Sequence, residues 1–218
     1  MKEGSLQAMP AHRPAGIPSR TTGGYATGKS FVAAELEHLG CHLIYADRLG
    51  HETLLPSGEA YGPAIQLFGT SILQPDGTID RKALGEIVFE NRVLLEQLTD
   101  LVHPAVFRLE EKLMAQYAAS DPSGIVVVEA AILIETGRYR DYDRIIVTYC
   151  SLETQIARAI KRDLVTREQA LTRLKNQMPI EENRRFAHYL IDTDHTKEET
   201  AASVREIYLD LKRYAEQT

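Results

Sequence analysis

Residues 23–30, with the sequence GGYATGKS, fit the phosphate-loop pattern G-x-x-x-x-G-K-[ST] in full. Glycines let a backbone curl so that successive N–H groups point at phosphate oxygens, and a helix that follows adds its positive end. Lys29 can neutralise charge on the β- and γ-phosphates, and the Ser30 hydroxyl can ligate Mg²⁺. The pattern predicts ATP binding with Mg²⁺ as the cofactor, and a chance glycine turn is the alternative. The residues expected to contact ATP are Gly23, Gly24, Ala26, Thr27, Gly28, Lys29 and Ser30.

Carboxylates stand at the ends of two predicted strands, where ligands bind in open parallel sheets. Asp47 ends the strand expected over 41–47, so we expect it near Lys29 with no other chain between them. It could accept the proton of an attacking hydroxyl or help to hold Mg²⁺, and a helix N-cap or a solvated strand end is the alternative. Glu129, at the end of the next predicted strand, could hold the metal through water or make a structural hydrogen bond. Glu135 is a weaker candidate.

Arginines crowd the helical region before the last predicted strand. Arg158 and Arg162 are spaced i, i+4 and share a helix face, where like charges repel unless an anion lies between them. ATP phosphates would serve as that anion if the segment closed as a lid. The alternative is a solvated face paired with Asp163 and Glu168. The other arginines of the region are Arg167 and Arg173.

These side chains need a scaffold, and the chain predicts an α/β fold with a central parallel sheet flanked by helices. Buried parallel strands are expected over 124–130 and 143–149, which are rich in β-branched residues, and shorter strands over 41–47 and 188–192. Helices are expected over 28–39 and 101–119, with mainly helical structure over 48–100. Helix caps are expected at Asp80, Ser151, Thr166 with Gln169, and Thr196 with Glu199.

The first residues do not fit this scaffold. Residues 1–20 include Pro10, Pro14 and Pro18, a composition typical of a loop or tail. The strand that should lead into the phosphate loop is therefore missing, order is expected to begin near Gly23, and the region beside the loop is expected to be poorly packed. Three explanations stay open: a divergent form, a shifted reading frame, which we favour, and a decaying copy.

The composition limits the classes of partner. The formal net charge is −6, and an acidic chain is a poor general binder of nucleic acid, because phosphate contacts require clustered lysine and arginine. The chain has neither a run of 18 or more apolar residues nor an apolar signal segment, so we expect a cytoplasmic protein with no membrane partner. Cys41 and Cys150 are interpreted as buried thiols. A monomer or a weak homo-oligomer is expected.

Several stretches follow one another in a characteristic order: TGGYATGKS, YADRLGHE, FGTSILQPDGTIDRKALGEIVF, LVHPAV, VVVEAAILIETG, RAIKRDLVTREQALTRLKNQMP and AHYLID. In this order they resemble the dephospho-CoA kinase family, and the match covers nearly everything after residue 22. The resemblance implies transfer of the γ-phosphoryl group of ATP to the ribose 3′-hydroxyl of dephospho-CoA, giving coenzyme A and ADP. It also implies a single P-loop kinase domain over 21–218, with a helical CoA-side region at 48–100 and a lid at 151–185.

The resemblance further implies roles for individual residues. By position, Asp47 would be the base, Arg162 with Arg158 would contact ATP from the lid, and His103 would lie near the acceptor. From the residues alone, a single histidine is more often structural than catalytic. The departures from the family's usual residues are Tyr45 for an aspartate, Thr193 for an asparagine and Phe31 for a threonine.

Other functions stay open beside this one. Another P-loop nucleoside or nucleotide kinase would carry the same loop, and acceptor competition would separate the two. A nucleotide-binding protein without turnover would result if the unusual N-terminus disables the loop. A GTP-switched regulator is less favoured, because the chain contains no Asn-Lys-x-Asp motif.

Overall fold

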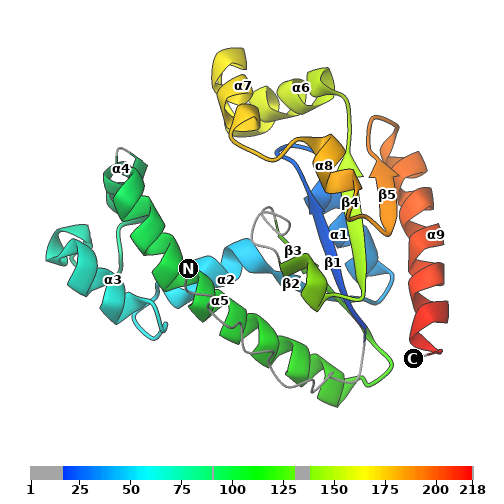
Figure 1. The fold of residues 1–218 in the computed structure, drawn as a ribbon, viewed down its shortest axis with the longest axis horizontal. Coiled ribbons are helices and arrows are strands. Elements are labelled where there is room, and N and C mark those ends of the chain that lie inside the picture. The colour runs from blue at the N-terminus through cyan, green and yellow to red at the C-terminus, as the bar shows by residue number, and fades with distance from the viewer. Residues whose placement is uncertain (1–16, 90, 131–137, 218) are drawn as a thin grey trace, which may run out of the picture.

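The structure is a computed structural model, and it describes residues 17–89, 91–130 and 138–217. Its centre is a five-stranded sheet in the order β2-β3-β1-β4-β5, in which all paired strands are parallel (Figure 1). The strands are β1 (Ile17–Gly23), β2 (His42–Tyr45), β3 (Ile125–Glu129), β4 (Arg144–Tyr149) and β5 (Tyr189–Asp192). This architecture confirms the predicted α/β class.

Helices connect the strands and cover both faces of the sheet (Figure 1). The helices before β3 are α1 (Lys29–His38), α2 (Ala46–Thr53), α3 (Tyr61–Phe68), the short η1 (Thr70–Ile72), α4 (Arg81–Phe89) and α5 (Arg92–Ser120). Those after β3 are the short η2 (Arg138–Asp141), α6 (Leu152–Asp163), α7 (Arg167–Lys175), α8 (Ile180–Arg184) and α9 (Lys197–Ala215). Residues 48–100 are mainly helical, as predicted, and α6 with α7 stands above the sheet beside the phosphate loop.

The central strand, β1, is the largest difference from the sequence-based expectation. It pairs with β3 on one side and β4 on the other, so that Arg20 lies opposite Val128 and Ile145. The expectation of an irregular segment over 1–20, with order beginning near Gly23, is therefore wrong for residues 17–22. Residues 1–16 lie outside the described part of the chain. The signal from Pro18, which argues against a central strand, is overridden here, because two apolar neighbours offer backbone hydrogen bonds along both edges of β1.

The strand before the phosphate loop is present, and its cost to stability comes from the polar side chains that it buries. Ser19, Arg20, Thr21 and Thr22 are all buried in the middle of the sheet. Side chains alternate along a strand, so Ser19 and Thr21 face one layer and Arg20 and Thr22 face the other. The hydroxyls of Ser19 and Thr21 have no hydrogen-bond partner, and such a group costs about 1–3 kcal/mol when buried.

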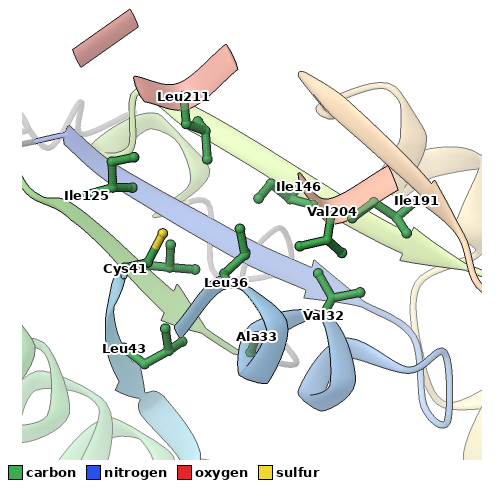
Figure 2. Packing of buried hydrophobic residues seen from close by; sticks show 11 residues of the cluster. Val32, Ala33, Leu36, Cys41, Leu43, Ile125, Ile146, Ile191, Val204 and Leu211 are labelled. Atoms are coloured by element: carbon green, nitrogen blue, oxygen red, sulfur yellow. The ribbon is translucent and has the colours of Figure 1, made fainter. Parts of the chain in front are cut away.

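Helices α1 and α9 cover one face of the sheet. Figure 2 shows Val32 and Leu36 of α1, with Val204 and Leu211 of α9, lying against the strands. The opposite face packs on α5 and contributes Val126, Val128, Ile145 and Val147 of β3 and β4. A separate apolar cluster holds the helices of residues 48–100 together through Ala64, Ile72, Ile79, Leu84 and Val88.

Local signals in the sequence locate most helix ends correctly. The Asp80 carboxylate accepts hydrogen bonds from the backbone N–H groups of Lys82 (2.9 Å) and Ala83 (3.1 Å), and Ser151 caps α6. The two predicted capping boxes are present at the starts of α7 and α9. The helix expected over 101–119 begins earlier, at Arg92, where Asn91 caps it. Pro104 lies inside this helix and does not end it.

Two further observations concern the cysteines and the lengths of the helices. Cys41 and Cys150 are buried free thiols, as predicted. None of the helices in the described part of the chain is long and apolar enough to span a membrane.

Candidate active site

The phosphate loop lies between the end of β1 and the start of α1. Residue 23 must be a glycine, because its neighbours lie too close for a side chain. An added Cβ would lie 2.6 Å from the Thr148 carbonyl oxygen and 2.8 Å from Thr27 Oγ1. Gly28 has φ 85°, a conformation that L residues rarely adopt, and α1 begins at Lys29. The strand, loop and helix that a phosphate site needs are thus all present.

Lys29 and Ser30 occupy the places that the loop pattern predicts. Lys29 Nζ donates hydrogen bonds to the carbonyl oxygens of Gly23 and Gly24, both at 2.8 Å, so the cation lies over the loop. The Ser30 hydroxyl donates to Glu129 Oε1 at 3.1 Å. A hydroxyl beside a carboxylate provides the hard oxygen ligands that Mg²⁺ prefers. Within the described residues no group of three or more His, Cys, Asp or Glu side chains could hold a metal, and Glu135 lies outside them.

Asp47 lies in the first turn of α2, so the expectation of a strand end is wrong. Strand β2 stops at Tyr45, and the chain turns into helix before the carboxylate is reached. Strand β3 lies between β2 and β1 in the sheet, so the expectation that no other chain separates Asp47 from Lys29 is also wrong. Asp47 is exposed, which leaves its carboxylate accessible to a ligand.

A cavity of about 510 Å³ lies beside Asp47, between α2 and α5. Its lining includes Asp47, His51, His103 and Glu110, together with Arg20 of the central strand. The structure therefore brings Asp47 and His103 to one cavity. Apolar side chains of α5, among them Val102, Val106 and Phe107, form the rest of this wall.

The pKa values of both histidines of the cavity lie below the ordinary value, which favours the neutral ring. Burial lowers the pKa of His103 below its ordinary value, although Asp100 acts in the opposite direction. Burial, with the nearby Arg81, lowers the pKa of His51 as well. The two rings can therefore form hydrogen bonds with a ligand in the cavity without adding positive charge to it.

A buried polar network that was not predicted from the sequence closes the bottom of the cavity. Arg20 Nη1 donates to the Tyr142 hydroxyl at 2.7 Å and lies 3.6 Å from Glu110 Oε1. The Tyr142 hydroxyl in turn donates to Glu110, and burial raises the pKa of Tyr142 far above its usual range. Arg20 Nε and Glu110 Oε2 are buried without a hydrogen-bond partner. No signal in the sequence indicated this network, because Arg20 stood in a segment interpreted as a tail.

Arg158 is tied to the phosphate loop through Thr193, the residue that replaces the family's usual asparagine. Arg158 donates to Thr193 Oγ1 at 2.9 Å and to the Thr193 carbonyl oxygen at 2.5 Å. The Thr193 hydroxyl donates to the Thr27 carbonyl oxygen at 2.8 Å. The guanidinium of Arg158 is thereby fixed beside the loop that would bind ATP phosphates.

Arg162 lies beside the loop as well, but it is paired. Its Nε and Nη2 atoms donate to Asp163 at 2.7 and 3.0 Å, and its guanidinium carbon lies 5.2 Å from the centre of the Tyr25 ring. Pairing with Asp163 was the alternative interpretation of this helix. Arg162 does not pair with Glu168, the other acidic residue of that alternative. Arg167, the neighbour of Glu168, pairs with Glu153.

A second cavity, also about 510 Å³, adjoins the loop on the β4 side of the sheet. It is lined by Gly24, by the turn that enters α6, and by residues 177–181 after α7. Of its lining residues, sequence reasoning named Gly24 as an ATP contact, whereas most of the others come from segments far away in the chain.

Residues 20–199 match the family model for dephospho-CoA kinase. The dephospho-CoA kinase of Geobacter metallireducens is 44% identical over 183 residues, 84% of this chain and 90% of that protein. The dephospho-CoA kinase of Aquifex aeolicus is 36% identical over 192 residues, 88% of this chain and 96% of that protein. A solved structure from Thermus thermophilus superposes with a TM-score of 0.77 at 27% identity, covering 90% of this chain and 98% of that one.

Proposed function

The chain belongs to the dephospho-CoA kinase family, and from this premise we propose how its residues perform the reaction. The protein phosphorylates dephospho-CoA to coenzyme A. We propose that the γ-phosphoryl group of ATP passes to the ribose 3′-hydroxyl, that residues 48–100 with α5 form the acceptor side, and that residues 151–185 form the lid.

The observation that carries this proposal is the cavity at Asp47. Its lining reaches the central strand through Arg20 and the end of β3 through Ala130, which is next to Glu129. An acceptor bound there would lie on the side of the sheet from which the phosphate loop is approached. Asp47, exposed in the first turn of α2, would accept the hydroxyl proton as the new O–P bond forms. His103 and His51, both neutral, would orient the acceptor by hydrogen bonds.

On the donor side, the loop amides and the start of α1 would bind the β- and γ-phosphates. Lys29 Nζ would exchange the carbonyl oxygens of Gly23 and Gly24 for phosphate oxygens. Arg158 and Arg162 would neutralise charge that spreads over the transferring group. The cavity beside Gly24 would accept the nucleoside part of ATP.

Mg²⁺ would be held by the Ser30 hydroxyl, by Glu129 directly or through water, and by phosphate oxygens. When bound, the ion would neutralise charge that develops on the transferring phosphoryl group. Because the reaction consumes ATP, we place it in the cytoplasm. A monomer or weak homo-oligomer stays a prediction, which sedimentation velocity would test.

The test is ADP release measured with ATP, Mg²⁺ and dephospho-CoA. Wild-type protein is expected to turn over only when dephospho-CoA is present. Asp47→Asn keeps the shape of the side chain and removes the base, so we expect kcat to fall by about 10²–10⁴-fold while KM for ATP changes little. Asp210→Asn, which removes a carboxylate of α9, is the matched control and should retain full activity.

The outcomes separate the alternatives. Turnover that adenosine or a nucleoside monophosphate supports better than dephospho-CoA would indicate another small-molecule kinase. ATP binding without turnover in folded wild-type protein would indicate a nucleotide-binding protein that the polar β1 has inactivated. Full activity of Asp47→Asn would remove Asp47 from the mechanism.

A further inference from the structure

Tyr25 is the residue of the phosphate loop whose side chain reaches the lid. Its hydroxyl donates a hydrogen bond to Asp163 at the end of α6 and accepts one from Arg173 Nη1 of α7 at 2.9 Å. The guanidinium carbons of Arg162 and Arg173 lie 5.2 and 5.6 Å from the centre of its ring. One loop side chain thus contacts cations from both lid helices, at distances typical of cation–π contacts.

Asp163 joins the same group of side chains. Its carboxylate accepts from Arg162 at 2.7 and 3.0 Å and from Arg173 at 3.1 Å. The hydrogen bonds from Arg162 and Tyr25 hold the pKa of this carboxyl well below its usual range, so it stays ionised. One carboxylate therefore serves two guanidinium groups, and this cluster keeps one net positive charge beside the loop.

A third link runs through the backbone. Gln177, just after α7, accepts a hydrogen bond from the Tyr25 N–H at 2.5 Å. This N–H belongs to the loop that would bind phosphate, so the lid is connected to Tyr25 through its backbone as well as through its hydroxyl and ring. The arginines are consequently placed relative to the loop and not only relative to each other.

We propose that Tyr25 is a positioning residue that holds Arg162 and Arg173 beside the phosphate loop, where the two cations meet the transferring phosphoryl group. The inference rests on the proposed function and adds Tyr25 and Arg173 to it. Without the Tyr25 hydroxyl, α6 and α7 keep their mutual ion pairs through Asp163 and lose a side-chain connection to the loop. The two guanidinium groups then meet the phosphates in many arrangements, of which few are productive.

The test compares Tyr25→Phe and Tyr25→Leu with wild-type protein. Phenylalanine keeps the ring beneath the arginines and removes the hydroxyl, so we expect kcat to fall about tenfold. Leucine removes the ring as well, and kcat should fall about a hundredfold. KM for dephospho-CoA should stay within about twofold in both variants, because the acceptor cavity does not include Tyr25.

Tyr189→Phe is the matched control. The Tyr189 hydroxyl donates to Asp210 at 2.5 Å, and Asp210 accepts from Arg213 at 2.9 Å, which repeats the Tyr–Asp–Arg arrangement far from the loop. This variant should keep wild-type kcat. Equal or higher kcat in Tyr25→Phe than in wild type would overturn the proposal, since Tyr25 would then restrain the lid or do nothing. Thermal unfolding gives the fraction of folded protein in each variant. If kcat fell only in proportion to that fraction, the proposal would be overturned too.

Two further measurements keep this inference separate from the proposed function. Absence of dephospho-CoA-dependent turnover in wild-type protein would contradict the function itself. Wild-type activity in Arg162→Ala and Arg173→Ala would leave the function intact and refute the positioning role, because there would be no arginine for Tyr25 to position.

Discussion

The buried pair Arg20–Glu110 leads to the sharpest prediction about stability. The side chains are 5% and 0% exposed, and the shortest distance between their charged atoms is 3.6 Å. Removing one partner leaves the other charge buried and unpaired, which costs about 3–5 kcal/mol. A domain of this size has a free energy of unfolding of about 5–15 kcal/mol, so either single change removes a large part of it.

Three variants make a thermodynamic cycle: Arg20→Met, Glu110→Met and the double change. Each single variant should lose about 3–5 kcal/mol, whereas the double variant should match wild type or gain about 1–4 kcal/mol, because both desolvation costs disappear together. Urea unfolding followed by circular dichroism measures all four proteins, which suits a chain with no tryptophan. Arg20 Nε and Glu110 Oε2 have no partners even in the wild type, and this favours the apolar double variant.

An exposed ion pair of α5 is the control for this cycle. Arg92 and Glu96 lie 3.0 Å apart with side chains 91% and 62% exposed. Glu96→Met should therefore change the free energy of unfolding by less than about 1 kcal/mol. The reasoning is refuted if Glu110→Met is as mild as Glu96→Met, or if the double variant loses the sum of the two single losses.

Three further predictions concern other parts of the site. The pKa of His103 is lowered in the folded state, so the unfolded chain binds the proton first; stability should be full above about pH 6.5 and fall as the pH drops below it. Chemical unfolding between pH 5 and 8 measures this, and His103→Gln should make the fall shallower. Burial raises the pKa of the Cys41 thiol to about 12 and raises that of Cys150, so a thiol reagent at pH 8 should label neither quickly until urea is added; rapid labelling of the native protein would contradict their burial. Thr193→Val removes the hydroxyl between Arg158 and the loop and should raise KM for ATP about tenfold, whereas Thr193→Ser should resemble wild type.

Local signals made much of the fold and the loop predictable from sequence. The strands β3 and β4 are continuous β-branched runs, and such runs indicate burial on both faces without further information. The caps at Asp80, Ser151, Thr166 and Thr196 depend only on side chains a few residues away. The phosphate loop is equally easy to recognise, because its whole pattern lies within residues 23–30.

Features that depend on distant partners could not be predicted. Strand β1 is formed by pairing with β3 and β4, whereas Pro18 within it argues against a central strand. The burial of Arg20 requires Glu110 and Tyr142, which come from other parts of the chain. Asp47 was predicted at the end of a strand but lies in the helix that follows, because α2 begins directly at the end of β2 without a turn.

The polar central strand also affects the order in which the protein folds. Ile17 pairs with Ile125 and Ser19 with Arg144, so the middle of the sheet closes only after more than half of the chain has been made. Little apolar attraction draws SRTT into place, and closing such a long loop is entropically costly. We therefore expect β1 to insert late, into a gap whose two sides are the unpaired backbone edges of the apolar strands β3 and β4. Until it does, those edges are open to strands of other molecules, and the yield of native protein should depend on concentration and temperature during refolding.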